Sequence, residues 1–247
     1  MSDIIVIKIG TGVLTRENGT LDGSSLVRLV TSVAALQAKG YQCIMVSSGA
    51  VGAGVSALGL ESYPDDVASR QAAAAVGQAR LMQRYETLFQ QFDLNVAQLL
   101  LTNSDLEENR ERVSTTMRRL LDLGSIIPIV NENDSVAVEE LRVGDNDMLS
   151  AKVAEFLNAE QLILFTTVDG LMPPEGGEII EKVESLEEVL DFARDESGKF
   201  SIGGMASKLQ AVGYATNCGV RVTIANGRNP EQLSDLVDGK GRGTRFL

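Results

Sequence analysis

The stretch Ile4-Ile5-Val6-Ile7-Lys8-Ile9-Gly10-Thr11-Gly12 decides the fold. Five of its first six residues are β-branched and apolar, a composition typical of a strand buried on both faces of a parallel sheet. The two glycines then permit a tight turn whose backbone amides can hold anionic oxygens, and Lys8 adds a positive charge beside them. The alternative is a lysine that leaves the strand into solvent. Because charged residues seldom lie inside so apolar a strand, we favour an anion site at its carboxyl end.

Five more apolar runs alternate with helical segments, and this rhythm predicts βαβ units around a mainly parallel sheet. The predicted strands are 43–47, 96–101, 126–130, 162–167 and 220–225. The predicted helices are 24–40, 65–91, 108–123, 148–157, 186–193 and 204–218. The Pro- and Gly-rich stretch 172–177 is the clearest surface loop. Since the strand–helix rhythm resumes after it, we expect one α/β domain over residues 1–247.

The composition bounds the possible functions. The chain has 247 residues, 44% of them hydrophobic, and a net charge of −12, which is typical of a soluble acidic protein and disfavours nucleic acid or an anionic membrane as a partner. Histidine is absent, so serine–histidine nucleophiles and histidine metal sites are excluded. Cys43 and Cys218 form no metal-spaced pair and are expected to fill the core as reduced thiols. Without a leader or a long apolar stretch, we expect a cytoplasmic protein.

A second glycine-rich segment, residues 47–54, follows a predicted buried strand. Its small residues would let a ligand approach the backbone closely. Gly52-x-Gly54-x-x-Ala57 formally matches a dinucleotide fingerprint and so opens an oxidoreductase interpretation. The match is weak because it begins five residues after the strand, and no acid stands about 20 residues further on to bind a ribose. Close packing between helices is an almost equal alternative.

Two acidic loops, 131–134 and 144–147, are the third candidate. The first follows a predicted strand and the second precedes a helix, so both should approach the crevice at the carboxyl ends of parallel strands. Asp145 alone could cap a helix. The number of short Asn and Asp side chains exceeds what capping needs. They suit recognition of an amino group or a shell of hard oxygen ligands around a metal and its waters.

The fourth candidate is Gly203-Gly204-Met205-Ala206-Ser207-Lys208, where glycines begin a helix and a lysine stands one turn in. Helix N-terminal amides with a following lysine form a phosphate site in physical terms. No Walker A sequence occurs in the chain. Two lysine-bearing glycine turns with acidic loops between them indicate phosphoryl transfer, which needs charge neutralisation and alignment more than a nucleophilic side chain.

Together these segments resemble the amino acid kinase family. The resemblance follows the family's order through residues 6–11, 46–51, 74–78, 98–102, 128–134, 143–147 and 203–208. It implies an αβα sandwich with a mainly parallel central sheet. The Asn-Glu-Asn-Asp and Gly-Asp-Asn-Asp pair is similar to the branch that phosphorylates the side-chain carboxylate of L-glutamate, the first step of proline biosynthesis, and unlike the aspartate, acetylglutamate, carbamate and uridylate kinases.

The resemblance also implies roles for individual residues. Lys8 and Lys208 would contact the ATP phosphates, and Asp147 would complete the catalytic set near the substrate's α-amino group. Ser48, Asp134 and Asn146 would bind glutamate. The ATP-binding residues would be Lys8, Gly10, Thr166, Thr167, Ile202, Gly203, Gly204, Met205, Ala206, Ser207 and Lys208. The cofactor would be Mg²⁺ carried by ATP, with no metal ligand assigned to a side chain. Since a carboxylate is ionised at neutral pH, the acceptor needs no general base.

Two positions depart from the family pattern: Thr167 replaces the usual Asp and Ile202 replaces the usual Thr, so nucleotide contacts should differ. The resemblance implies a glutamate-binding lobe over about 1–158 and a nucleotide-binding lobe over about 159–247. We expect the chain to lack the RNA-binding-like (PUA) domain that follows in many relatives. We further expect feedback inhibition by proline, a homodimer or homotetramer, and glutamyl phosphate reductase as a possible pathway partner.

Three alternatives stay open from the sequence. The chain could be another acyl-phosphate-forming kinase of the same family, of the aspartate or acetylglutamate type. It could be an NAD(P)-linked oxidoreductase built on the glycine-rich segment after the second strand. It could also be a non-catalytic sensor of nucleotides or amino acids that keeps only the fold, although both lysines and every acidic-loop position are present.

Overall fold

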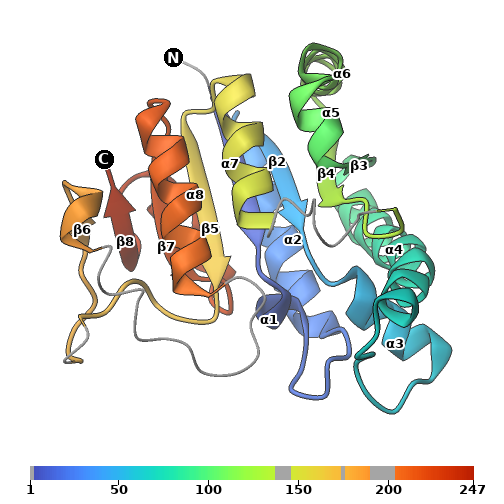
Figure 1. Ribbon diagram of the computed structural model, residues 1–247. Helices are drawn as coiled ribbons and strands as arrows, with labels where there is room; N and C mark the ends of the chain where they lie inside the picture. Colours follow the sequence, from blue (N-terminus) through green and yellow to red (C-terminus); the bar gives the residue numbers. More distant parts are fainter. Residues whose placement is uncertain (1–2, 137–145, 174–175, 190–203) are drawn as a thin grey trace.

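A mainly parallel sheet of eight strands forms the centre of the molecule, in the order β3-β4-β2-β1-β5-β7-β8-β6 (Figure 1). The computed structural model describes residues 3–136, 146–173, 176–189 and 204–247. The strands are β1 Ile4–Ile9, β2 Gln42–Ser47, β3 Asn95–Leu101, β4 Ile126–Glu132, β5 Gln161–Thr166, β6 Lys182–Val183, β7 Arg221–Asn226 and β8 Gly243–Phe246. Every ladder is parallel except that between β7 and β8. The predicted α/β class and parallel sheet are confirmed.

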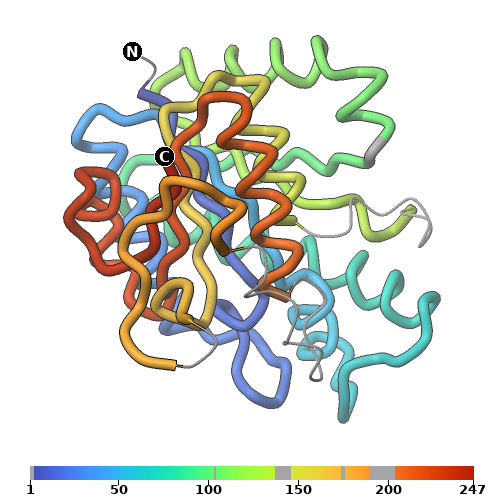
Figure 2. Tube along the Cα trace, turned by 60° about the vertical axis from the view of Figure 1, so that its left-hand side comes forward, coloured from blue at the N-terminus to red at the C-terminus, as the bar shows by residue number. Residues whose placement is uncertain are grey.

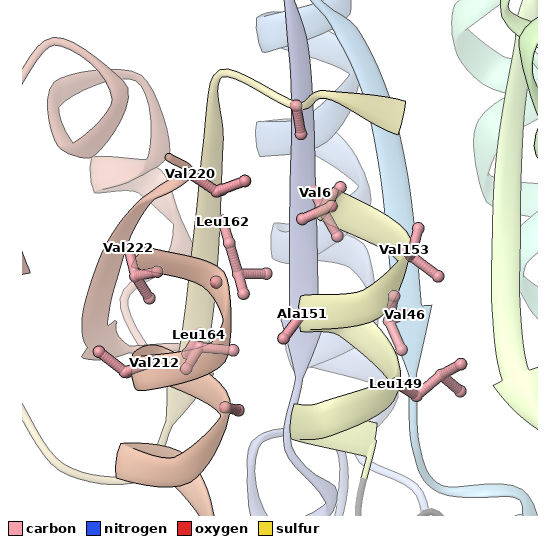
Figure 3. Packing of buried hydrophobic residues seen from close by; sticks show 14 of the residues in the cluster. Val6, Val46, Leu149, Ala151, Val153, Leu162, Leu164, Val212, Val220 and Val222 are labelled. Atoms are coloured by element: carbon pink, nitrogen blue, oxygen red, sulfur yellow. The ribbon is translucent and has the colours of Figure 1, made fainter. Parts of the chain in front are cut away.

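Helices cover both faces of this sheet, which makes the expected αβα sandwich. The α-helices are α1 Thr11–Leu14, α2 Gly23–Ala38, α3 Ala50–Leu58, α4 Val67–Phe89, α5 Asn103–Glu107, α6 Arg110–Asp122, α7 Asn146–Leu157, α8 Met205–Asn217 and α9 Leu233–Val237. One apolar cluster joins strand residues to α6, α7 and α8, and the other joins them to α2, α4 and α9. Figure 3 shows α7 and α8 laying residues such as Leu149 and Val212 over Val6, Val46 and Leu164.

Strand β1 divides its side chains between the two layers because successive residues of a strand point to opposite faces. Ile5, Ile7 and Ile9 belong to the α2 and α4 layer, whereas Val6 belongs to the α7 and α8 layer. The same alternation directs Lys8 toward α7 and α8. Strand pairing also fixes this position, since β1 lies between β2 and β5 in the middle of the sheet.

Several predicted boundaries differ from the structure. The expected helix 186–193 begins as a 3-10 turn, Leu186–Glu188, and residues 190–193 lie outside the described part. Strands β6 and β8 were not predicted because they are short and lack a continuous apolar run. Cys43 is buried as expected, but Cys218 is exposed, since it caps the end of α8. The division into two lobes stays a prediction, although one sheet runs through both because β1 pairs with β5.

Helices α3 and α4 approach each other backbone to backbone. A Cβ atom at Gly54 would lie 1.9 Å from the carbonyl oxygen of Ala73, and one at Gly77 would lie 1.8 Å from that of Ala50. No residue larger than glycine fits either place. Figure 2 shows this helix pair beside the loop that follows α1. Gly54 of the segment 47–54 therefore serves helix packing, and the dinucleotide fingerprint is wrong because Gly52 and Gly54 lie inside α3.

Candidate active site

Two lysines and one aspartate form a buried charged group at the carboxyl edge of the sheet. Lys8 Nζ lies 2.5 Å from Asp147 Oδ1, and Lys208 Nζ lies 3.1 Å from Asp147 Oδ2. Asp147 is fully buried, and the two lysines are 3% and 8% exposed. Lys8 is the penultimate residue of β1, Asp147 stands in the first turn of α7, and Lys208 stands in the first turn of α8. Three distant segments therefore meet in one place.

Among the described contacts, one carboxylate lies between two ammonium groups, so these three side chains together sum to one positive charge. Buried charges require partners, and Asp147 supplies both lysines with one. The resemblance placed this carboxylate near a substrate amino group. The structure instead turns its two oxygens toward the two lysines, which favours a role in holding the cations in position. An excess positive charge in a water-poor site suits the stabilisation of a phosphoryl group in transfer.

A pocket of about 130 Å³ lies at the start of α7, where it is lined by Asn146, the residue before Asp147. The three residues expected to bind substrate, Ser48, Asp134 and Asn146, all line this pocket. The other lining residues are Thr11, Gly49, Ala50, Val51, Gly52, Tyr63, Arg70, Gln71, Asn131 and Glu132. The structure therefore brings the predicted substrate residues together from the β2–α3 turn, the segment after β4 and the start of α7.

Sequence analysis missed the part of the pocket wall contributed by the first turn of α4 and the segment before it. Tyr63, Arg70 and Gln71 line the pocket from there. No glycine turn or acidic run marks these residues, and Arg70 and Gln71 belong to an ordinary helical pattern. Only the packing of α4 against α3 brings them to the site. Arg70 adds a guanidinium group, which is suited to a carboxylate.

Amide side chains form a hydrogen-bond network in the wall of this pocket. Asn146 Nδ2 shares its two hydrogens among three acceptors: Ser48 Oγ at 2.9 Å, Asn131 Oδ1 at 3.0 Å and the carbonyl oxygen of Ser47 at 3.3 Å. Asn131 Nδ2 donates in turn to Gln78 Oε1 at 3.0 Å. These bonds join α7, β4, α4 and the turn after β2, so the pocket wall is held by four elements at once.

Tyr85 of α4 holds the turn after β2 in place through a hydrogen bond. The hydroxyl groups of Tyr85 and Ser47 are 2.8 Å apart, and Ser47 Oγ also donates to the carbonyl oxygen of Ser48. Burial raises the pKa of Tyr85, so its hydroxyl stays neutral. The turn that presents Ser48 is therefore fixed to α4 by a neutral hydrogen bond.

The expected nucleotide side lies at the ends of β1, β5 and α8. The amide of Gly10 donates to the carbonyl oxygen of Phe165 at 3.0 Å, which places the first glycine turn beside Thr166. A Cβ at Gly12 would lie 2.8 Å from Cγ2 of Thr167, so this departure from the family pattern contacts the turn directly.

Helix α8 begins after Gly204, and Met205, Ala206 and Ser207 occupy its first turn with no described side chain capping it. Its N-terminal amides are therefore suited to an anion. Ile202 and Gly203 lie outside the described residues, as do Gly144 and Asp145 of the second acidic loop. The nucleotide-binding assignments of Gly10, Thr166, Thr167 and the first turn of α8 stay predictions.

The model of the amino acid kinase family matches residues 3–226. The chain belongs to this family. It is 44% identical to the glutamate 5-kinase of Symbiobacterium thermophilum over 98% of its own length and 95% of that protein. It is 41% identical to the glutamate 5-kinase of Clostridium tetani, covering 98% and 93%, and 42% identical to glutamate 5-kinase 1 of Bacillus subtilis, covering 97% and 68%.

Several solved structures share this fold. Carbamate kinase from Giardia lamblia bound to AMP-PNP matches 100% of this chain and 98% of its own, with a TM-score of 0.69 and 15% identity. N-acetylglutamate synthase from Neisseria gonorrhoeae matches 99% of this chain and 61% of its own, with a TM-score of 0.70 and 18% identity. At such low identity these likenesses concern the fold alone.

Two features are absent from the described residues. No group of three or more Cys, Asp or Glu side chains there is placed to hold a metal ion. No helix in the same part of the chain is long and apolar enough to cross a membrane.

Proposed function

We propose that the chain is an ATP-dependent kinase that phosphorylates the side-chain carboxylate of L-glutamate to give L-glutamyl 5-phosphate. The observation that carries the proposal is the buried Lys8–Asp147–Lys208 group beside a pocket lined by Ser48, Asp134 and Asn146. The names of the relatives at 41–44% identity support the same substrate. The chemistry follows from the charges of this group.

In the proposed reaction, an oxygen of the glutamate side chain attacks the γ-phosphorus of ATP, and the bond from that phosphorus to the β,γ-bridging oxygen breaks. The attacking carboxylate is already ionised, so no proton must be removed from it. Negative charge shifts toward the leaving ADP as the phosphoryl group moves. Lys8 and Lys208 would stabilise this charge, and Asp147 would keep both ammonium groups aimed at it.

Glutamate brings two carboxylates and one ammonium group, and the pocket together with Lys8 offers a complement to each. Asp134 is suited to the ammonium group, and Asn146 presents a carboxamide beside it. Ser48 and Arg70 are suited to the α-carboxylate because they supply a hydroxyl and a guanidinium. The acceptor carboxylate would then point toward Lys8. Mg²⁺ would arrive with ATP, because this ion is commonly held by substrate phosphates and few carboxylates.

Proline shares the α-carboxylate and amino nitrogen of glutamate, so the same pocket is suited to bind it. We propose that proline inhibits the enzyme from this pocket and raises the apparent KM for glutamate. Replacement of Asn131 by alanine should then weaken both ligands together. A proline series on the purified chain measures this, and activity without any response to proline would refute the shared pocket.

Three further expectations belong to the proposal. The enzyme would act in the cytoplasm, assemble as a homodimer or homotetramer, and pass its product to glutamyl phosphate reductase. The last is what the resemblance implies, and the reactivity of an acyl phosphate is consistent with a partner that consumes it quickly. Light scattering on the purified chain reports the oligomer.

Trapping with hydroxylamine tests the reaction. The purified chain is incubated with Mg-ATP, hydroxylamine and one amino acid at a time, and an acyl phosphate then appears as its coloured hydroxamate. We expect colour with glutamate and none with aspartate or N-acetylglutamate. Colour with another acceptor but not with glutamate would assign the chain to another branch of the family, and the absence of any product would favour a sensor.

A further inference from the structure

In the side-chain amide of Asn146, the nitrogen has described hydrogen-bond partners and the oxygen has none. Its nitrogen makes all three hydrogen bonds to Ser47, Ser48 and Asn131, while its Oδ1 atom is buried and has no hydrogen-bond partner among the described residues. A buried acceptor without a donor is costly to the folded state. Such an atom in a ligand pocket is suited to an N–H group of the ligand.

Backbone groups fix the direction of this amide. The carbonyl oxygen of Ser47 only accepts, so the atom of Asn146 that faces it must be the nitrogen. The backbone amide of Glu132 only donates, so the atom of Asn131 that receives it at 2.9 Å must be the oxygen. Asn131 therefore accepts from Asn146 with its oxygen and turns its own nitrogen to Gln78. Reversal of either amide would set like groups against each other.

Gln78 is the last amide in this hydrogen-bond network and does not line the pocket. Its Oε1 atom receives Asn131 Nδ2 at 3.0 Å, the side chain is 8% exposed, and Gln78 is not among the residues that line the pocket. It stands next to Gly77, whose contact with the backbone of Ala50 brings α4 close enough for the bond. Asn131 is only 2% exposed, so its side-chain nitrogen needs an acceptor within the protein. The Oε1 atom of Gln78 is that acceptor.

We infer that Gln78 is a positioning residue for substrate recognition: through Asn131 it holds the amide of Asn146 so that Oδ1 accepts a hydrogen bond from the α-ammonium group of the substrate. The inference rests on the proposed function and extends it to a residue outside the pocket. Loss of the Gln78 acceptor would leave the buried nitrogen of Asn131 without this bond, so Asn131 would be held by fewer contacts and would orient Asn146 less firmly.

Replacement of Gln78 by methionine tests the inference, because methionine keeps the length of the side chain and removes the acceptor. We expect Q78M to raise the KM for glutamate about tenfold, equivalent to about 1.4 kcal/mol. The kcat and the KM for ATP should stay within about twofold, since the lysine group is untouched. Q78E keeps an acceptor oxygen and should recover most of the loss. Q83M, the same change at an exposed position of α4, is the control and should behave as wild type.

Glutarate separates positioning from general damage, because it is the same dicarboxylate without the ammonium group. Its inhibition constant against glutamate should be the same in wild type and Q78M. An equal rise for glutarate, a Q78E variant as impaired as Q78M, or an unchanged KM in Q78M would overturn the inference. A wild-type chain that makes no hydroxamate from glutamate would refute the proposed function instead, so the two failures are distinguishable.

Discussion

Replacement of Asp147 by asparagine should abolish most of the turnover and leave glutamate binding nearly intact. At an effective dielectric constant of about 20, the attraction of Asp147 is about 7 kcal/mol for Lys8 at 2.5 Å and about 5 kcal/mol for Lys208 at 3.1 Å. Desolvation of three buried groups offsets much of this. Removal of one partner from a buried ion pair typically costs about 3–5 kcal/mol, because an uncompensated charge stays behind.

The variant leaves two ammonium groups buried beside a neutral amide, so the lysines should move apart. We expect kcat to fall by about 10²-fold or more, the loss typical of a displaced electrostatic stabiliser. The KM for glutamate should change less than about threefold, because the pocket residues are untouched. A loss of about 3 kcal/mol in stability corresponds to a fall in Tm of about 6–12 °C for a chain of this size.

Steady-state kinetics with coupled detection of ADP, together with thermal unfolding, measures both effects. Asp122→Asn is the matched control, since Asp122 is exposed at the end of α6. A strong rise in the KM for glutamate with normal kcat would refute the reasoning and return Asp147 to the substrate's amino group, as the resemblance first placed it. A loss confined to the KM for Mg-ATP would assign it to the metal and phosphates.

Three other experiments test separate parts of the structure. Lys8→Ala should lower kcat by about 10²-fold with a smaller effect on the KM for glutamate, and wild-type turnover would remove Lys8 from the mechanism. Tyr85→Phe should lower the free energy of unfolding by about 1 kcal/mol through loss of the bond to Ser47, measured by urea denaturation; an unchanged midpoint would contradict this. Burial raises the pKa of Cys43 to about 12, so at pH 8 a thiol reagent should label only the exposed Cys218, and two labels per folded chain would show that the core opens.

The sheet was predictable because its six principal strands are continuous apolar runs. Strand β8 was not, because Thr244 and Arg245 interrupt its pattern and its place depends on antiparallel pairing with β7. A short strand at a distant position is stabilised by its neighbours more than by its own residues. The sequence signal therefore weakens where tertiary contacts decide the structure.

The residues of the site also differ in whether the sequence predicts them. Lys8, Ser48 and Asn146 stand in turns or acidic loops whose spacing carries chemical meaning, so they could be found in the sequence. Arg70 and Gln78 belong to a regular helix. The resemblance includes 74–78 but implies no role for Gln78, because the function of both residues depends on which face of α4 meets α3. The rotation of α4 about its own axis is set by backbone contacts with α3, and no local pattern of side chains predicts it.

The close approach of α3 and α4 limits how this enzyme could be engineered for heat resistance. Exchange of helical glycines for alanine is a common route to higher stability, since alanine restricts the unfolded chain. At Gly54 and Gly77 the added methyl group would collide with a carbonyl oxygen, so each exchange would separate the helices and disturb the neighbouring pocket. Gly213 in α8 is a better target, because there the obstacle is the end of the flexible Leu186 side chain. A library for thermal selection should therefore hold Gly54 and Gly77 fixed.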